Sequence, residues 1–161
     1  MKKGYQHITG IGLLELLLVL SVTAVMLIVS VQYYRSAKSG QESATLVNSF
    51  NTIKSAVENY ITDNPTATFP TLTTLYTGGY LPNAYQNGRN TWLGTIVVAA
   101  GQGTKAGLFS VTQTKIPASV CGEAQPQLLA TLNSALGESI IPATATGCKG
   151  DNNTVIVYYS Q

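Results

Sequence analysis

The sequence predicts an α+β protein, in which one long N-terminal helix packs through its second half on an antiparallel β-sheet head. An apolar run, Ile11–Val31, contains a single charge in 21 residues. An amphipathic helical pattern continues from it to about Thr62. Short β-branched runs follow, in a region that contains two cysteines. We therefore expect a short N-terminal segment over residues 1–10, a helix over residues 11–62 and a globular head over residues 63–161.

The apolar run Ile11–Val31 is long enough to cross a membrane. At ~1.5 Å per residue, a helix of this length spans about 31 Å, and a bilayer core is ~30 Å thick. Lys2 and Lys3 precede the run and would hold its start on the cytoplasmic side. We expect residues 11–31 to be transmembrane and the rest of the chain to lie outside the cytoplasm.

Two other kinds of N-terminal segment fit these residues less well. A cleaved secretory signal peptide has an apolar core of only ~7–15 residues with a small-x-small site soon after it. Here the nearest such site, Ala37-Lys38-Ser39, lies well beyond the end of the run. A plain signal anchor fits the length and orientation but does not explain Glu15, because a carboxylate inside an apolar span costs roughly 2.5–3.5 kcal/mol.

The residues around Gly10 carry a resemblance that accounts for this carboxylate. The stretch Gly10-Ile11-Gly12-Leu13-Leu14-Glu15-Leu16 resembles the processing site of type IV prepilins, where a glycine ends the leader and a glutamate is the fifth mature residue. The resemblance implies that the prepilin peptidase, a membrane aspartic peptidase, cleaves between Gly10 and Ile11. It also implies methylation of the new Ile11 amine. Ile11 stands where most members of the better-known subclass have Phe, which suggests the type IVb branch.

The resemblance gives Glu15 a role in assembly. Cleavage creates an α-amine on Ile11, which is largely cationic at neutral pH. The Glu15 carboxylate would neutralise the Ile11 amine of a neighbouring subunit as helices bundle. Alternatively, Glu15 pairs with the amine of its own chain or with the positive end of its own helix. Both kinds of pairing can hold in succession: Glu15 would pair within its own chain in the membrane and with a neighbouring subunit after assembly.

The helix should continue into the head as an amphipathic segment. Apolar residues recur at spacings of three and four, at Leu46, Phe50, Ile53, Val57 and Tyr60 or Ile61. Pro65 then disfavours helix at the residue before it. Gly40 is a position where the helix could soften, because glycine costs ~1 kcal/mol in a helix interior.

The head should consist of a turn-rich loop followed by strands and one helix. Residues 64–91 are rich in Pro, Gly and Asn, with a short helical turn expected at Leu72–Tyr76. Two runs, Thr95–Ala99 and Leu108–Thr112, predict an antiparallel hairpin. Residues 125–137 predict a helix with its leucines on one side, and Thr154–Tyr159 predicts a final strand. The stretch Asn90–Thr95, which opens the first strand, is similar to type IVb pilins.

Cys121 and Cys148 are expected to form a disulfide. Two cysteines outside the cytoplasm most simply pair, and type IV pilins staple their C-terminal region in this way. A metal site would need further ligands, and the single histidine of the chain, His7, lies in the leader. A redox-active pair would have a closer spacing than these 26 intervening residues.

Charge and composition give no indication of an enzyme or of a nucleic-acid-binding protein. Without residues 1–10, seven basic residues face seven acidic ones, so no basic excess favours DNA or RNA. The acidic residues of the head, Asp63, Glu123, Glu138 and Asp151, are isolated in the sequence. We expect no catalytic residues, no metal and no cofactor.

The predicted function is that of a structural filament subunit, most simply a major pilin of the type IVb kind. Its expected partners are the prepilin peptidase, other copies of itself in a helical filament, and the pilus assembly machinery of the inner membrane. Its expected location is the bacterial inner membrane before assembly and the extracellular pilus afterwards, where it would serve adhesion, aggregation or conjugation-type contact. A type II secretion pseudopilin would share the N-terminal features. A membrane-tethered extracytoplasmic binding domain is the alternative of another class.

Overall fold

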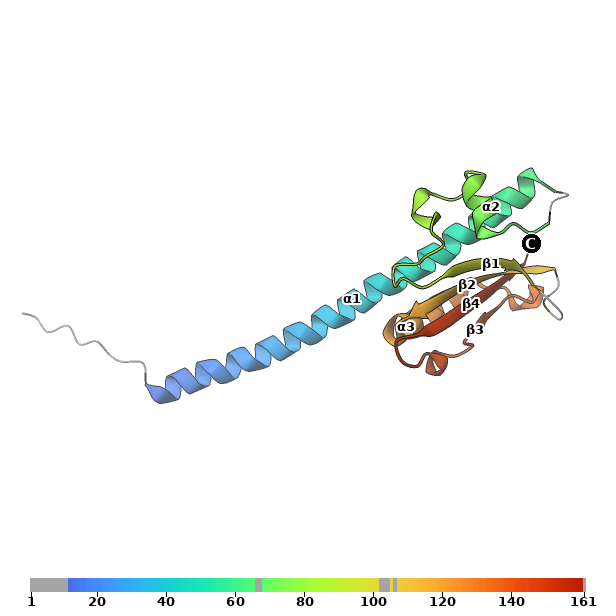
Figure 1. Ribbon diagram of the computed structural model, residues 1–161. Coiled ribbons are helices and arrows are strands. Elements are labelled where there is room, and N and C mark those ends of the chain that lie inside the picture. The colour runs from blue at the N-terminus through green and yellow to red at the C-terminus, as the bar shows by residue number, and fades with distance from the viewer. Residues whose placement is uncertain (1–11, 66–67, 102–104, 106, 161) are drawn as a thin grey trace, which may run out of the picture. The chain divides into compact units, whose positions relative to one another are not determined.

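The computed structural model of the chain has an α+β fold, as predicted (Figure 1). The structure describes residues 12–65, 68–101, 105 and 107–160, so Gly10 and Ile11 lie outside the described residues. The chain divides after Lys38 into two compact units. Each unit is described by itself.

The first unit contains the first part of helix α1, which as a whole runs without interruption from Leu13 to Asp63. Every described residue up to Lys38 is exposed. The helix ends one residue later than the sequence predicts, and the N–H of Asn64 donates to the carbonyl of Tyr60 at 3.0 Å. Pro65 follows directly, and its ring disfavours a helical residue before it.

The second unit begins with the remaining part of α1, which packs on the sheet of the head (Figure 1). The predicted apolar stripe is confirmed, since Leu46, Phe50, Ile53 and Val57 are fully buried. Tyr60 and Ile61 are partly buried and pack against the same core. The helix therefore supplies one layer of the head and the sheet supplies the other.

The sheet is antiparallel and has four strands in the order β1-β2-β4-β3. The predicted hairpin is confirmed as β1 (Ile96–Ala100) and β2 (Leu108–Ile116). The predicted final strand is confirmed as β4 (Asn153–Ser160). A fourth strand, β3 (Ser139–Ile141), was not predicted, because three residues are too few to show a period-2 pattern. β4 thus lies in the interior of the sheet, between β2 and β3.

Helix α3 (Ala118–Thr131) begins and ends earlier than the predicted helix over residues 125–137. It starts directly after β2 and carries Pro126 in its interior, where Pro usually breaks a helix. The predicted leucine face is wrong in part. Leu128 is fully buried, but Leu129 and Leu136 are 43% and 56% exposed. The buried face of α3 includes Val120, Cys121, Ala124 and Gln125 as well as Leu128.

Short elements fill the connections. The helical turn expected at Leu72–Tyr76 is confirmed as α2 (Leu72–Thr77), and a 3₁₀ turn, η1 (Asn83–Tyr85), follows it. Two further 3₁₀ turns, η3 (Ser134–Leu136) and η4 (Ala145–Gly147), flank β3.

Candidate functional site

The apolar part of α1 exposes all of its large apolar side chains. Between Leu13 and Val31 these side chains are 46–82% exposed. In water such a surface is unfavourable by about 25 cal/mol per Å². By its length and composition, α1 is able to span a membrane. The exposed segment is therefore compatible with membrane anchoring.

The polar side chains of this apolar segment are satisfied inside the helix. Ser21 donates its hydroxyl to the carbonyl of Leu18 at 2.8 Å, and Thr23 donates to Leu20 at 2.9 Å. The hydroxyl of Ser30 likewise donates to the carbonyl of Met26 at 2.8 Å. A helix with its hydroxyls bonded internally loses little when it leaves water for lipid.

Glu15 is the exception in this segment. It lies in the first turn of α1, whose start is defined by the Leu16 N–H donating to the Gly12 carbonyl at 3.1 Å. Its carboxylate makes no hydrogen bond or ion pair with any described residue. The positive end of the helix dipole favours a negative charge at this position. Because Ile11 is outside the described residues, pairing of Glu15 with the Ile11 amine stays a prediction.

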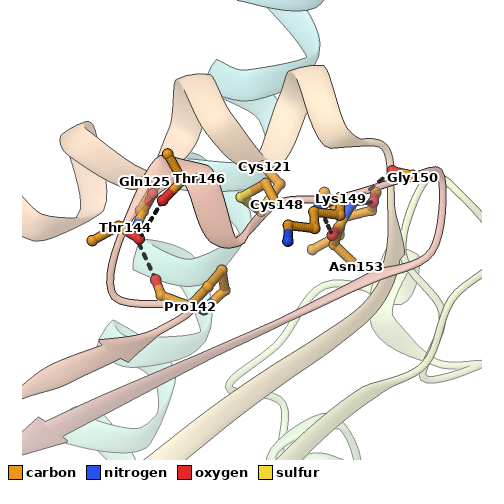
Figure 2. The surroundings of a disulfide bond; sticks show 10 residues. Cys121, Gln125, Pro142, Thr144, Thr146, Cys148, Lys149, Gly150 and Asn153 are labelled. Carbon is orange, nitrogen blue, oxygen red and sulfur yellow. Dashed lines mark hydrogen bonds between the residues drawn. A yellow bond between two sulfur atoms is a disulfide. The ribbon is translucent and has the colours of Figure 1, made fainter.

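The predicted disulfide between Cys121 and Cys148 is confirmed (Figure 2). Cys121 lies on the buried face of α3 and Cys148 directly follows η4, with their Cα atoms 5.7 Å apart. The bridge ties α3 to the segment that enters β4. By chain entropy, closing a loop of this length is worth about 3–4 kcal/mol.

Hydrogen bonds hold the loop between β3 and η4 beside this disulfide (Figure 2). The side-chain amide of Gln125 donates to the carbonyl of Pro142 at 2.6 Å. The hydroxyls of Thr144 and Thr146 lie 2.9 Å apart. The Gln125 bond thus fixes the start of this loop against α3, and the disulfide fixes the residue that follows η4.

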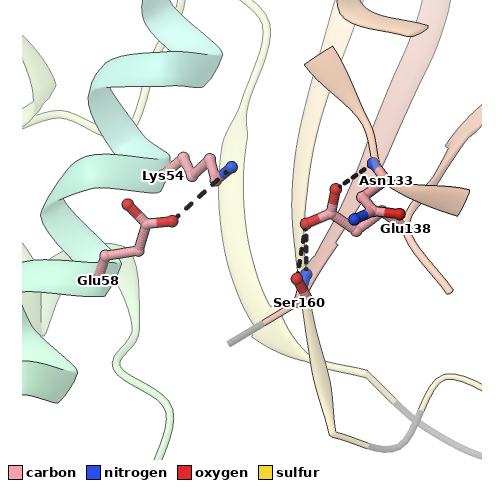
Figure 3. A network of polar contacts seen from close by, with 5 residues as sticks. All are labelled: Lys54, Glu58, Asn133, Glu138 and Ser160. Atoms are coloured by element: carbon pink, nitrogen blue, oxygen red, sulfur yellow. Dashed lines mark hydrogen bonds and ion pairs between the residues drawn. The ribbon is translucent and has the colours of Figure 1, made fainter. Parts of the chain in front are cut away.

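Glu138 joins separate parts of the head through contacts that the sequence did not reveal (Figure 3). Its description as isolated is wrong, because the side chain is only 7% exposed and accepts three hydrogen bonds. One carboxylate oxygen accepts from the Asn133 N–H at 2.6 Å. The other accepts from the N–H and the hydroxyl of Ser160, at 2.9 and 2.8 Å. It therefore joins the end of β4 to the turn that precedes β3.

The surroundings of Glu138 lower its pKa. Burial alone would raise the pKa, but the N–H groups of Asn133 and Ser160 and the Ser160 hydroxyl together outweigh it. Lys54 on α1 adds a smaller attraction. Lys54 also lies 3.7 Å from Glu58 and 5.1 Å from the ring centroid of the buried Tyr159. The described contacts of this carboxylate are hydrogen bonds that hold Asn133 and Ser160 together.

Asn90 organises the loop that the sequence analysis found similar to type IVb pilins. Its side-chain oxygen accepts from the N–H groups of Trp92 and Gly94, at 3.1 and 2.8 Å. Its amide donates to the carbonyl of Thr114 at 2.8 Å. A Cβ on Gly94 would overlap the backbone of Thr114, and Leu93 has a positive φ of 59°. Only glycine fits this close approach of loop and strand.

Comparison of the chain with known proteins gave no match to a family model, a curated protein or a solved structure. The resemblance to prepilins consequently rests on the stretch Gly10–Leu16 and on the order of elements in the chain. Of the predicted site residues, the structure brings Cys121 and Cys148 together. It places Glu15 at a helix N-terminus, and Gly10 and Ile11 lie outside the described residues.

Proposed function

We propose that this chain is a structural subunit of a type IV pilus filament. The observation that carries the proposal is an apolar helical segment whose described large apolar side chains are all exposed. Its first turn holds one carboxylate, Glu15, that has no partner among the described residues. In the sequence this turn follows directly on Gly10 and Ile11. A soluble domain would bury such a segment. A filament subunit uses it first to span the membrane and then to pack against other subunits.

Its first use is in the bacterial inner membrane, where lipid covers the exposed side chains from Leu13 to Val31. The prepilin peptidase cuts after Gly10 and methylates Ile11 at this stage. The hydroxyls of Ser21, Thr23 and Ser30 are bonded within the helix, so burying them in lipid costs little free energy. The remaining cost is the charge of Glu15.

Its second use is in the filament, where the same side chains pack against helices of other subunits. The carboxylate of Glu15 then neutralises the Ile11 amine of a neighbour. Pairing of the two charges removes the cost of each one alone in an apolar bundle. The inner-membrane assembly machinery would move the subunit between these two surroundings.

The head serves as the outer, extracellular surface of the filament. Its core is closed by the second part of α1, and its C-terminal region is fastened by the disulfide. These features support a durable structural surface rather than an enzyme. Contact with other cells or surfaces, by adhesion or aggregation, is the activity that follows.

Electron microscopy of filaments sheared from cells with and without this gene tests the proposal. Filaments should be present in cells that express the chain, absent from the deletion strain and restored by complementation. Mass spectrometry of the sheared filaments should identify this chain as the main component. Filaments that persist unchanged in the deletion strain would overturn the proposal.

A further inference from the structure

The head contains a groove of about 490 Å³ that neither the disulfide nor the Glu138 contacts involve. Its walls are the exposed side of α1 from Thr45 to Thr52 and the loop from Ala84 to Trp92. Gln113 of β2 also lines it. The volume lies within the range of pockets that hold small molecules, roughly 300–1,000 Å³. All of the lining residues belong to the second unit of the chain.

The groove carries one positive charge and no negative one. Arg89 is its only charged lining residue, and it is exposed. Its guanidinium makes no hydrogen bond or ion pair with any described residue. A planar guanidinium binds a carboxylate through two parallel hydrogen bonds. The part of the groove lined by Arg89 is therefore suited to a carboxylate.

Gln113 brings an unsatisfied polar side chain to the lining of the groove. The side chain is fully buried, and its amide nitrogen donates to the hydroxyl of Ser49 at 3.0 Å. Its amide oxygen has no partner. A buried acceptor left without a donor costs free energy, so native proteins rarely retain one without a bound partner. That oxygen is also closed to solvent, so a ligand hydroxyl would reach it only if the side chains around it moved.

The rest of the lining is neutral and favours a sugar over a peptide or a lipid. Thr45, Asn48 and Thr52 present hydroxyl and amide groups from α1. Tyr85 and Trp92 line the groove with partly buried aromatic rings that also pack on the core. Fixed aromatic side chains combine an apolar surface with a polar group, and a sugar ring has both kinds of surface. We propose that this groove binds a carboxylated sugar unit of the uronic acid type, with its carboxylate on Arg89.

Binding of digalacturonate to the full-length chain in detergent micelles tests this proposal, with digalactose as the neutral probe. By calorimetry, the acidic disaccharide should bind at least about tenfold more tightly than the neutral one, as expected for a charged hydrogen bond. The preference should weaken with added salt. Equal affinity for the two probes, or no saturable binding of either, would overturn the proposal.

Three variants locate the binding. Arg89→Gln should remove the preference for the acidic probe, and Thr52→Trp, which fills the groove, should remove binding of both probes. Lys149→Gln alters an exposed cation outside the groove and should bind as the parent does. If Arg89→Gln and Lys149→Gln behave alike, the carboxylate does not bind at Arg89.

A carboxylate of a second copy is the competing occupant of the groove. If Arg89→Gln prevents self-association and leaves sugar binding intact, the groove belongs to that interface and the sugar proposal fails. The experiment does not depend on filament formation, because it uses the unassembled chain. Failure of sugar binding would therefore not contradict the proposed filament function. Absence of filaments would likewise not contradict sugar binding in the groove.

Discussion

The hydrogen-bond partners of Glu138 come from two separate places in the chain. Its two oxygens accept from Asn133, five residues earlier, and from Ser160, 22 residues later. Nothing in the local sequence indicates these partners, because both backbone donors are supplied by the chain path rather than by residue type. An acidic residue that looks exposed by composition is thereby made part of the core.

Replacing Glu138 with Gln should lower the stability of the head by about 1–3 kcal/mol. The side-chain amide of Gln would face one of the N–H donors with an N–H of its own. The measurement is thermal or urea unfolding of the full-length chain in detergent, followed by circular dichroism. Glu123→Gln, on the exposed side of α3, is the matched control and should leave stability unchanged.

The lowered pKa of Glu138 also predicts how the stability of the head depends on pH. A carboxyl whose pKa is lower in the folded state contributes its stability above its unfolded pKa, which is about 4.3. That contribution is lost as pH falls through the lower, folded value. The parent chain should therefore lose more stability below about pH 4 than Glu138→Gln does. Parallel pH profiles for the two proteins would show that this carboxylate is not the group responsible.

Gly94 predicts a second effect at the scale of one residue. Gly94→Ala should destabilise the head by about 1–3 kcal/mol or more, since its Cβ would overlap the Thr114 backbone. Gly122→Ala is the control, because nothing lies within 4 Å of a Cβ there. In helix α3 that change should stabilise by about 0.5–1 kcal/mol. Equal unfolding midpoints for the two variants would contradict the close approach at Gly94.

Among the elements, those with a strong pattern were predictable and those defined by tertiary contacts were not. The stripe Leu46–Val57 and the hairpin of β1 and β2 could be predicted because their apolar residues recur with the periods of a helix, 3.6, and of a strand, 2. β3 is three residues long and owes its strand conformation to pairing with β4. The helix over residues 125–137 was predicted from its leucines, whereas the buried face of α3 begins earlier, at Val120 and Cys121.

The same distinction applies to the candidate site. Cys121 and Cys148 were found because two cysteines leave one pairing. Glu15 was found because a charge in an apolar run is conspicuous. Glu138 and the groove at Arg89 could not be found, since both consist of side chains and backbone groups that meet only after folding.

The disulfide predicts an effect at the scale of two elements. Cys148→Ser should lower the stability of the head by about 3 kcal/mol, because α3 and the segment entering β4 lose their covalent link. Unfolding with and without reductant measures it. The reduced parent and the reduced variant should coincide. A parent chain whose midpoint does not change on reduction would show that the link adds nothing.

Glu15 predicts an effect on how α1 associates. Glu15→Gln keeps the shape of the side chain but removes its charge, so membrane insertion and processing should continue. Filament assembly should fail, because an incoming subunit would bury an unpaired Ile11 amine. Leu14→Gln, which adds a polar group next to it without touching the charge, is a matched control. Normal filaments from Glu15→Gln cells would leave capping of its own helix as the role of Glu15.

For the whole molecule, the proposed life cycle predicts a defined N-terminus. Intact-mass measurement of membrane-extracted protein should give a chain that starts at Ile11 and carries one methyl group. Replacing Gly10 with a bulky residue should leave the precursor, with Lys2 and Lys3 still present, in the membrane fraction. A mature chain that begins at Met1 or near Gly40 would contradict processing at Gly10.

The position of β4 has a consequence for the order of events during synthesis. β4 pairs with both β2 and β3, yet it is the last of these four strands in chain order. Until it is made, β2 and β3 have no common neighbour, and Glu138 has no Ser160 to bond. The sheet of the head therefore remains incomplete until β4 has been synthesised. A truncated or prematurely released chain would lack the strand that joins the two sides of its sheet, and such a product would be recognised as unfolded rather than accepted as a shortened subunit.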